Sequence, residues 1–199
     1  MNAEKIADAV ARRLFVELEA SGRHVHVTAQ QAQKLFGHQL TPKRPLSQPG
    51  QFLAAERVTV VGPKGEFREV AVLGPERKQA QVEISLTDAR VLGLQPPVRL
   101  SGDIEGSPGA VLIGSVGRVE LETGVIAAQC HIHLTPEAAE GFGVKDRQRV
   151  KLKALTRRGV VFEDVIVRVS PDIAPYAHLD YDEANACGFQ KGDLGRILP

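Results

Sequence analysis

Two histidine pairs in this sequence lie in closely similar surroundings. His24 and His26 belong to RHVHVTAQQAQKLFG, and His131 and His133 belong to CHIHLTPEAAEGFG. On a β-strand, residues i and i+2 point to the same face with Cα atoms about 6.6 Å apart, so both imidazoles of a pair could reach one metal ion. Because each copy continues with Thr, a short run and Phe-Gly, the repeat predicts two similar metal-binding elements.

One His-x-His pair by itself is weak evidence for a metal site. Two half-exposed strand histidines that bond to backbone or solvent would give the same pattern. The repetition favours metal binding, because only six histidines occur in the chain and four of them lie in these pairs. A catalytic zinc site takes three protein ligands and keeps an open position, so each pair needs a third ligand.

Glu83 and His178 are the candidate third ligands. Glu83, in QVEISLTD, interrupts the apolar side chains of a strand-like run, and His178 lies in PYAHLDYDEANA. The ordinary alternatives are an outward-facing strand residue for Glu83 and a loop histidine that caps the next helix for His178. Cys130 and Cys187 are expected to be small buried residues, neither ligands nor nucleophiles.

The segment GPERKQAQVE, residues 74–83, carries charged and amide side chains towards Glu83. If a strand alternates from Arg77, then Gln79, Gln81 and Glu83 share its face with the guanidinium. Such a surface suits phosphate beside a metal, because arginine binds phosphate through a planar fork of donors. The alternative is a solvated turn with a charged entry to the strand.

Two further polar residues lie at the edges of predicted turns. Gln51 is in QPGQF and Ser101 is in RLSGD, and both could add hydrogen bonds to a bound ligand. No cysteine, serine or lysine has a recognisable activating neighbour in the sequence, which argues weakly against a covalent catalytic route.

The elements that must position these residues are mostly β-strands. Short runs rich in Val, Ile and Leu are separated by turn signals, and apolar and polar residues alternate clearly in 149–155 and 160–170. Nineteen glycines and twelve prolines in such a chain favour small barrels or a sandwich over an open sheet. We therefore expect a mainly β fold with two similar units.

Four short helices are predicted. The first is amphipathic and covers residues 3–15. Two follow the histidine pairs, where Thr28 and Thr135 are N-cap residues and a glycine ends each segment. The last covers DYDEANACG, residues 180–188, with acidic residues in its first turn.

Composition limits the function classes. Lys plus Arg number 25 against 24 for Asp plus Glu, which leaves a formal net charge of +1 and no global field for nucleic acid or an anionic membrane. No apolar run approaches the ~20 residues of a membrane helix. The N-terminus does not have the pattern of a secretory signal, and two cysteines are too few for a disulfide framework, so we expect a cytoplasmic protein.

The motifs together resemble a known family. SGRHVHVT, LFG, QPGQF, VGPKG, LGPERKQAQVEIS, PVRLSGD, SPG, HIHLTPEAA and HLDYDEANA are similar, in order and spacing from about residue 20 to 187, to the PduL-type phosphate acyltransferases, or phosphate propanoyltransferases. The resemblance implies two small β-barrels with short capping helices. The first would comprise residues 1–22 and 129–199, closed by the N- and C-terminal parts of the chain, and the second residues 23–128.

The resemblance also implies an activity and a site. The family moves a short acyl group, propanoyl or acetyl, between coenzyme A and phosphate at a centre of two metal ions, usually zinc. Arg77, Gln51, Gln81 and Ser101 would bind phosphate, with Arg77 catalytic. The implied metal ligands are His24, His26 and Glu83 for one ion, and His131, His133 and His178 for the other.

One residue departs from the family's pattern. The family often has arginine before the second His-x-His, where this chain has Cys130. The resemblance further implies a homodimer, with acyl-CoA and phosphate as partners, in the cytoplasm or within a bacterial microcompartment. Another divalent transition metal could replace zinc.

We expect phosphate, positioned by Arg77 and one metal, to attack the thioester directly while the other metal stabilises the oxyanion. A zinc-dependent hydrolase could use the same ligands, although a hydrolase of neutral substrates would not need Arg77 and Gln81. The other rival is a non-catalytic, metal-stabilised interaction module, which predicts closed four-ligand sites.

Overall fold

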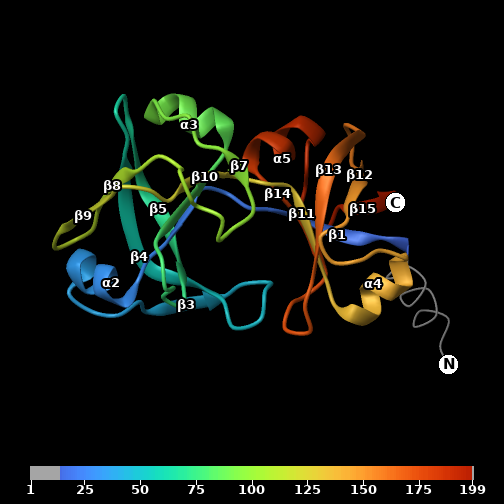
Figure 1. Ribbon diagram of the computed structural model, residues 1–199, viewed down its shortest axis with the longest axis horizontal. Helices are drawn as coiled ribbons and strands as arrows, with labels where there is room; N and C mark the ends of the chain where they lie inside the picture. The colour runs from blue at the N-terminus through green and yellow to red at the C-terminus, as the bar shows by residue number, and fades with distance from the viewer. Residues whose placement is uncertain (1–13, 199) are drawn as a thin grey trace. The chain divides into compact units, whose positions relative to one another are not determined.

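The computed structural model describes residues 14–198 (Figure 1). Apart from its last two residues, the helix expected over 3–15 lies outside the described residues. Within 14–198, no helix is long and apolar enough to cross a membrane. The described chain divides into two compact units, residues 14–21 with 129–198 and residues 22–128, which are described separately below.

The first unit is a closed barrel. Its strands follow the order β1 (Val16–Ala20), β14 (Tyr176–Leu179), β11 (His131–Leu134), β13 (Val160–Val169), β12 (Arg149–Leu155) and β15 (Leu194–Leu198). The N-terminal strand β1 closes the ring, because it pairs in parallel with β14 and antiparallel with β15. Buried side chains of these strands form one core, which includes Leu18, Ile132, Leu152 and Val167.

The period-two pattern of residues 149–155 is confirmed, whereas the alternation of 160–170 is interrupted at Glu163 and Asp164, which are both exposed. Along β12 every second residue is buried, from Val150 to Ala154, while the intervening charged or apolar residues face outward. Two helices follow strands of this barrel, α4 (Pro136–Phe142) and α5 (Tyr181–Cys187). Both helices and their terminal glycines were predicted, as was the N-cap Thr135 of α4. The N-cap of α5 is Asp180, which had not been predicted.

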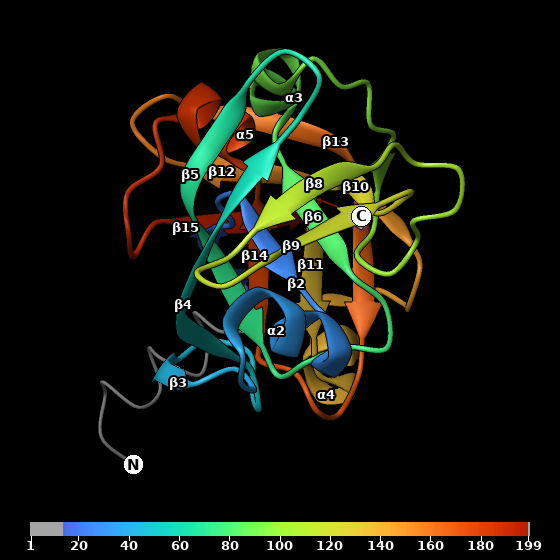
Figure 2. The same ribbon diagram turned by 90° about the vertical axis from the view of Figure 1, so that its left-hand side faces the viewer.

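The second unit is one nine-stranded sheet. Figure 2 turns this unit towards the viewer. The order is β7 (Val98–Arg99), β10 (Val125–Ala128), β6 (Gln81–Ile84), β2 (His24–His26), β5 (Glu66–Gly74), β4 (Phe52–Val61), β8 (Ala110–Ile113) and β9 (Arg118–Leu121), with β3 (Pro42–Pro45) beside β4.

The mainly β fold with short helices is confirmed, but the two units differ in closure. Over the described residues the ladder of the second sheet runs from β7 to β9 without joining its ends, so this unit is a half-barrel. Its core is formed by buried residues of both sheet and helices, including Val25, Leu35, Val72 and Leu92.

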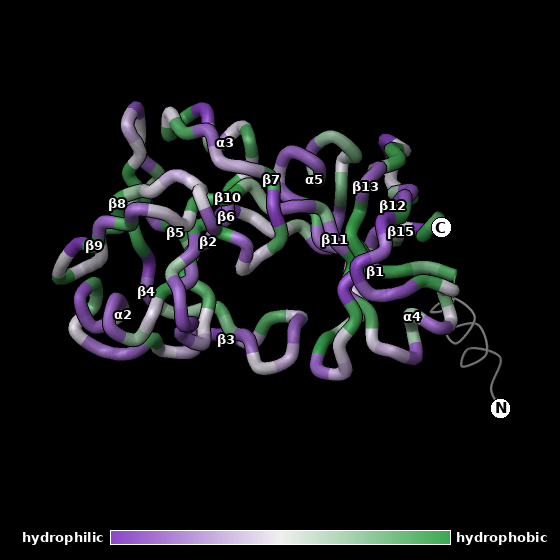
Figure 3. Tube along the Cα trace, viewed as in Figure 1, coloured by the Kyte–Doolittle hydropathy of each residue, from purple (hydrophilic) through white to green (hydrophobic). Residues whose placement is uncertain are grey.

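Two helices accompany this sheet, α2 (Ala29–Phe36) and α3 (Leu86–Leu92). Hydrophilic and hydrophobic residues alternate along α2 in Figure 3, and the buried residues Ala32, Leu35 and Phe36 attach it to the core. Helix α3 was not predicted from the sequence. Its signal is present, because Ser85 and Asp88 form a capping box and Gly93 ends the helix in the left-handed conformation.

Two Gly-x-x-Gly hairpins bond to the ends of these helices. In one, the Lys64 amide donates to Leu92 O at the end of α3, and in the other the Val116 amide donates to Leu35 O at the end of α2. The last carbonyls of a helix have no partner within the helix, so these amides satisfy them. A Cβ at Gly114 would collide with Leu35 O, so this contact requires glycine.

Candidate functional site

Each histidine strand lies between one antiparallel and one parallel neighbour. In the second unit β2 pairs antiparallel with β6 and in parallel with β5, and in the first unit β11 pairs antiparallel with β14 and in parallel with β13. The register sets His24 opposite Glu83 and His131 opposite His178. The two proposed third ligands therefore occupy equivalent positions of the two units.

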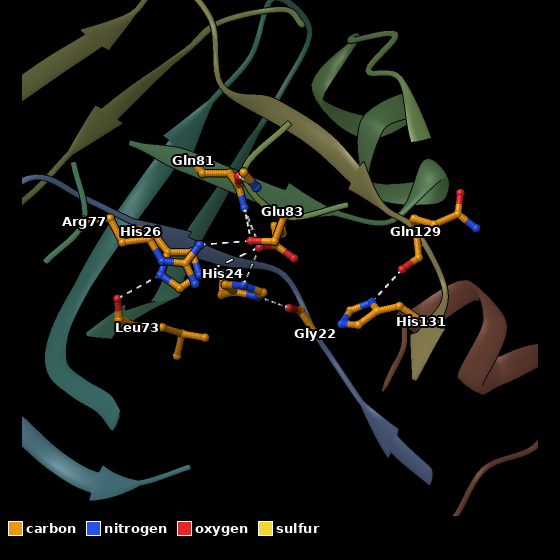
Figure 4. Close-up of polar contacts among 11 residues, drawn as sticks. Gly22, His24, His26, Leu73, Arg77, Gln81, Glu83, Gln129 and His131 are labelled. Carbon is orange, nitrogen blue, oxygen red and sulfur yellow. Dashed lines mark hydrogen bonds and ion pairs between the residues drawn. The ribbon is translucent and has the colours of Figure 1, made fainter. Parts of the chain in front are cut away.

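The cluster of the second unit, called the first cluster below, comprises His24, His26 and Glu83. Figure 4 shows the three side chains converging, with Arg77 and Gln81 beside them. Their possible ligand atoms all lie within 4.8 Å of one another, and all three residues are buried. Glu83 Oε1 is 3.4 Å from His24 Nε2 and 3.8 Å from His26 Nε2.

Backbone carbonyls orient both imidazoles of the first cluster. His24 Nδ1 is 2.8 Å from Gly22 O, and His26 Nδ1 is 3.1 Å from Leu73 O. A carbonyl can only accept, so each Nδ1 carries the hydrogen and donates it. In the neutral ring Nε2 then has a free lone pair directed into the cluster, which is the arrangement of a metal-binding histidine.

The electrostatics of this cluster favour a charged carboxylate. Burial alone would raise the pKa of Glu83, but His24, His26 and the Ser101 hydroxyl hold it well below its usual value. Burial, His24 and Arg77 lower the pKa of His26 to about 3, so that ring is neutral. Burial would also lower the pKa of His24, yet the neighbouring Glu83 carboxylate raises it overall.

The cluster of the first unit, called the second cluster below, comprises His131, His133 and His178. Their possible ligand atoms also lie within 4.8 Å of one another. His131 Nδ1 donates to Gln129 O at 2.8 Å, which repeats the arrangement of His24 with Gly22. The ring centroids are 4.8 to 5.0 Å apart.

Polar atoms of the second cluster lack partners within the described chain. Both ring nitrogens of His133 are buried without a hydrogen bond. His178 Nε2 lies 3.2 Å from Glu19 Oε2, but outside hydrogen-bond geometry. Burial and the neighbouring His131 and His178 lower the pKa of His133 to about 2, so the ring is neutral and its lone pair is available. Buried polar atoms without partners are uncommon in proteins, and a metal ion would satisfy them.

A chain of hydrogen bonds joins Arg77 to the first cluster. Arg77 Nη1 donates to the Ser101 hydroxyl at 2.9 Å, and Gln81 Nε2 lies 2.8 Å from the same oxygen. Gln81 Nε2 also donates to Glu83 Oε1. The Gln81 amide oxygen accepts from the Gly102 amide at 2.7 Å, which fixes its orientation. A half-buried cation is thus placed beside the candidate metal ligands.

One expectation about the segment of residues 74–83 needs correction. The strand does not begin at Arg77, because residues 75–80 form a loop and β6 starts at Gln81. The proline in the Gly-Pro turn of this loop cannot donate to a ladder. Gln51 lies just before β4, and among the described residues no hydrogen bond joins its side chain to the Arg77 network.

Cys130 and Cys187 are buried free thiols, as expected. Burial is the largest cause that raises the pKa of the Cys130 thiol, and neighbouring acidic groups add to it. A buried thiol with a raised pKa is a poor nucleophile. Glu19 was not predicted as a site residue, and it reaches His178 because β1 and β14 pair in register.

Comparison with known proteins identifies the class. The family model of phosphate propanoyltransferases matches residues 17–190. A phosphate propanoyltransferase of Clostridioides difficile is 48% identical over 98% of this chain and 94% of its own length. One from Enterococcus faecalis is 53% identical over 92% of this chain and 87% of its own length, and one from Thermotoga maritima is 52% identical over 89% and 86%.

A mainly β chain with two His-rich clusters and an adjoining arginine is thus placed among transferase enzymes. It belongs to the phosphate propanoyltransferase family. The resemblance of the motifs to this family and the expectation of an enzyme are both confirmed.

Proposed function

We propose that the protein transfers a propanoyl or acetyl group between coenzyme A and inorganic phosphate, with one divalent metal ion, zinc as first candidate, at each cluster. Family membership supports the reaction. The observation that carries the site is the hydrogen-bonded chain from Arg77 through Ser101 and Gln81 to Glu83. It combines an anion-binding cation with a metal-ligand set.

The residues of both clusters fit a transition metal. Two imidazoles with a carboxylate, or three imidazoles, are donor sets that zinc accepts, and three protein ligands leave room for a substrate atom. His133, whose two ring nitrogens are buried without a partner in the described residues, supports a bound ion in the second cluster. When bound, the ions supply Lewis acidity and positive charge for the developing oxyanion.

Arg77 binds the phosphate in this proposal. Phosphate is strongly hydrated and is repelled by anionic coenzyme A, so the site must neutralise and orient it. Ser101 holds the guanidinium, and Gln81 holds Ser101, so Arg77 is positioned before the substrate binds. Gln51 belongs to the predicted phosphate-binding set as well, and Gln51→Ala should raise the KM for phosphate if it contributes.

Transfer is direct. A phosphate oxygen attacks the thioester carbonyl carbon, the C–S bond breaks, and coenzyme A leaves as the thiolate and takes up a proton. The products are acyl phosphate and free coenzyme A. Burial of both cysteines supports a route without an acyl-enzyme, because a nucleophile must be reached by the substrate.

The test is release of free thiol from propanoyl-CoA and acetyl-CoA, with and without phosphate, before and after metal is stripped. We expect release to need both phosphate and metal. Metal-dependent release that ignores phosphate would indicate the hydrolase, and no release by folded, metal-loaded protein would favour the interaction module.

Arg77→Ala should keep both metals and lose phosphate dependence. Lys78→Ala is the matched control, because Lys78 is the adjacent cationic residue and is exposed. Unchanged phosphate kinetics in Arg77→Ala would exclude this residue from phosphate binding.

A homodimer, a cytoplasmic location and association with a microcompartment stay proposals drawn from the family resemblance. Light scattering on the purified protein would give the oligomeric state. Fractionation of the source cells would show whether the protein is free or sediments with a microcompartment.

A further inference from the structure

Arg23, directly before His24, takes part in a bidentate ion pair. Its Nη2 donates to Asp88 Oδ1 at 2.6 Å and its Nε donates to Asp88 Oδ2 at 3.1 Å. The guanidinium also lies over the Phe67 ring, 4.1 Å from the centroid. Asp88 is buried, and two parallel donors on a carboxylate give strong and directional binding. The side chain of Arg23 is therefore held from two sides.

This ion pair joins the two segments that carry the first cluster. On one side, Arg23 stands between His24 and Gly22, whose carbonyl accepts from His24 Nδ1. On the other side, Asp88 lies in the first turn of α3, immediately after the strand that carries Glu83. Asp88 also accepts from the Ser85 amide, so it is fixed within the capping box.

The consequence concerns the direction of His24. The Gly22 carbonyl sets the tautomer and the rotation of the imidazole, and it can do so only if the Gly22–Arg23 peptide is held still. The Arg23 pair holds that peptide against α3. A carbonyl that is free to rotate would leave His24 Nε2 less well directed towards a shared ion.

The second cluster supplies an internal comparison. Cys130 precedes His131 as Arg23 precedes His24, and Glu183 occupies the first turn of α5 as Asp88 does in α3. Each of these acidic side chains accepts a hydrogen bond from the backbone amide of the N-cap residue of its helix. At the position of the guanidinium the second cluster has the uncharged side chain of Cys130, so the Arg23–Asp88 pair is particular to the first cluster.

We propose that Arg23 is a positioning residue of the first metal cluster, which through its pair with Asp88 fixes the Gly22 carbonyl that orients His24. The inference rests on the proposed metal binding. It assigns a metal-affinity role to a side chain that is not itself a proposed metal ligand. A 10- to 100-fold loss of affinity is typical when a group behind a metal ligand is removed, and about this loss is expected here.

The test measures Co2+ affinity of the full chain carrying His133→Ala, which disables the second cluster. The d–d absorption of Co2+ reports both binding and coordination geometry. Arg23→Gln should weaken binding about 10- to 100-fold and alter the band shape. Asp88→Asn should have the same direction of effect, and the double variant should lose little more than either single one. Arg23→Lys, which keeps the charge but not the fork, should recover only part of the affinity.

Arg68→Gln is the matched control. Arg68 forms an exposed ion pair with Glu66 in the same unit, so its loss should leave Co2+ affinity unchanged. If Arg23→Gln lowers only the free energy of unfolding, and the folded variant binds Co2+ as the parent does, the positioning role is refuted. If the parent chain with His133→Ala binds no Co2+, and adding His24→Ala changes nothing, the metal site of the proposed function is refuted.

Discussion

Glu183 should make the stability of this protein fall as pH rises towards neutrality. Its carboxylate accepts from the Asp180 amide at 2.9 Å in the first turn of α5. Burial raises the pKa of Glu183 from 4.5 to about 7, with the charges of Asp180 and Asp182 adding to the effect. Among residues 14–198, no cationic side chain contributes to the pKa of Glu183, whereas Arg23 pairs with Asp88.

The sign follows from proton binding. Between pH 4.5 and about 7 the folded state keeps a proton on Glu183 that the unfolded chain has released. The free energy of unfolding therefore decreases with pH across this window. One pKa unit corresponds to about 1.4 kcal/mol, so the shift limits the contribution of Glu183 to about 3 kcal/mol. Because the side chain is partly exposed, we expect a change in the free energy of unfolding of about 1 to 3 kcal/mol.

Glu183→Gln tests this reasoning. The glutamine oxygen can still accept from the Asp180 amide, but it does not become charged. The variant should therefore be more stable than the parent at pH 8 by about 1 to 3 kcal/mol, and the difference should vanish near pH 4.5.

Urea unfolding of the metal-free chain from pH 4.5 to 8 measures the effect. Glu140→Gln, an exposed position on α4, is the control for removing one negative charge. A difference between Glu183→Gln and the parent that is constant over this pH range would refute the titration and leave only a packing effect.

Three further outcomes are expected. In Cys130→Arg the new guanidinium should pair with Glu183 and increase the Zn2+ affinity of the second cluster. Competition with a chromophoric chelator measures this affinity, and Cys130→Ala should leave it unchanged. Gly114→Ala should cost about 1 to 3 kcal/mol in urea unfolding because its Cβ meets Leu35 O, whereas Gly159→Ala, with open space around it, should cost little. Stripping metal should lower the Tm, since an ion present at 100 times its Kd adds about 2.7 kcal/mol to the folded state.

The sequence alone determined the local features of this protein. The period-two pattern of 149–155 is a strand, because alternate side chains of a strand face opposite sides. The caps at Thr28, Thr135 and Asp180 begin helices, because each side chain accepts from an amide three residues ahead. These interactions involve neighbours in the chain, so the residues that make them can be seen in the text of the sequence.

The same kind of signal marked α3 and was overlooked. Ser85 and Asp88 form a capping box that spans only four residues, and the strand-like run before it makes the whole segment resemble a strand. The prediction of a strand that begins at Arg77 was also wrong, because a loop occupies residues 75–80. Element boundaries depend on where the strand finds its partners, and that is not a local property.

Tertiary structure alone decided which distant residues meet. Strand pairing sets His24 opposite Glu83 and His131 opposite His178, and the motifs by themselves left both third ligands open. The Arg23–Asp88 pair joins residues 65 positions apart, and no short-range sequence pattern predicts it. The reason is physical: hydrophobic burial fixes the register of the sheet as a whole, and only that register brings these polar groups within reach of one another.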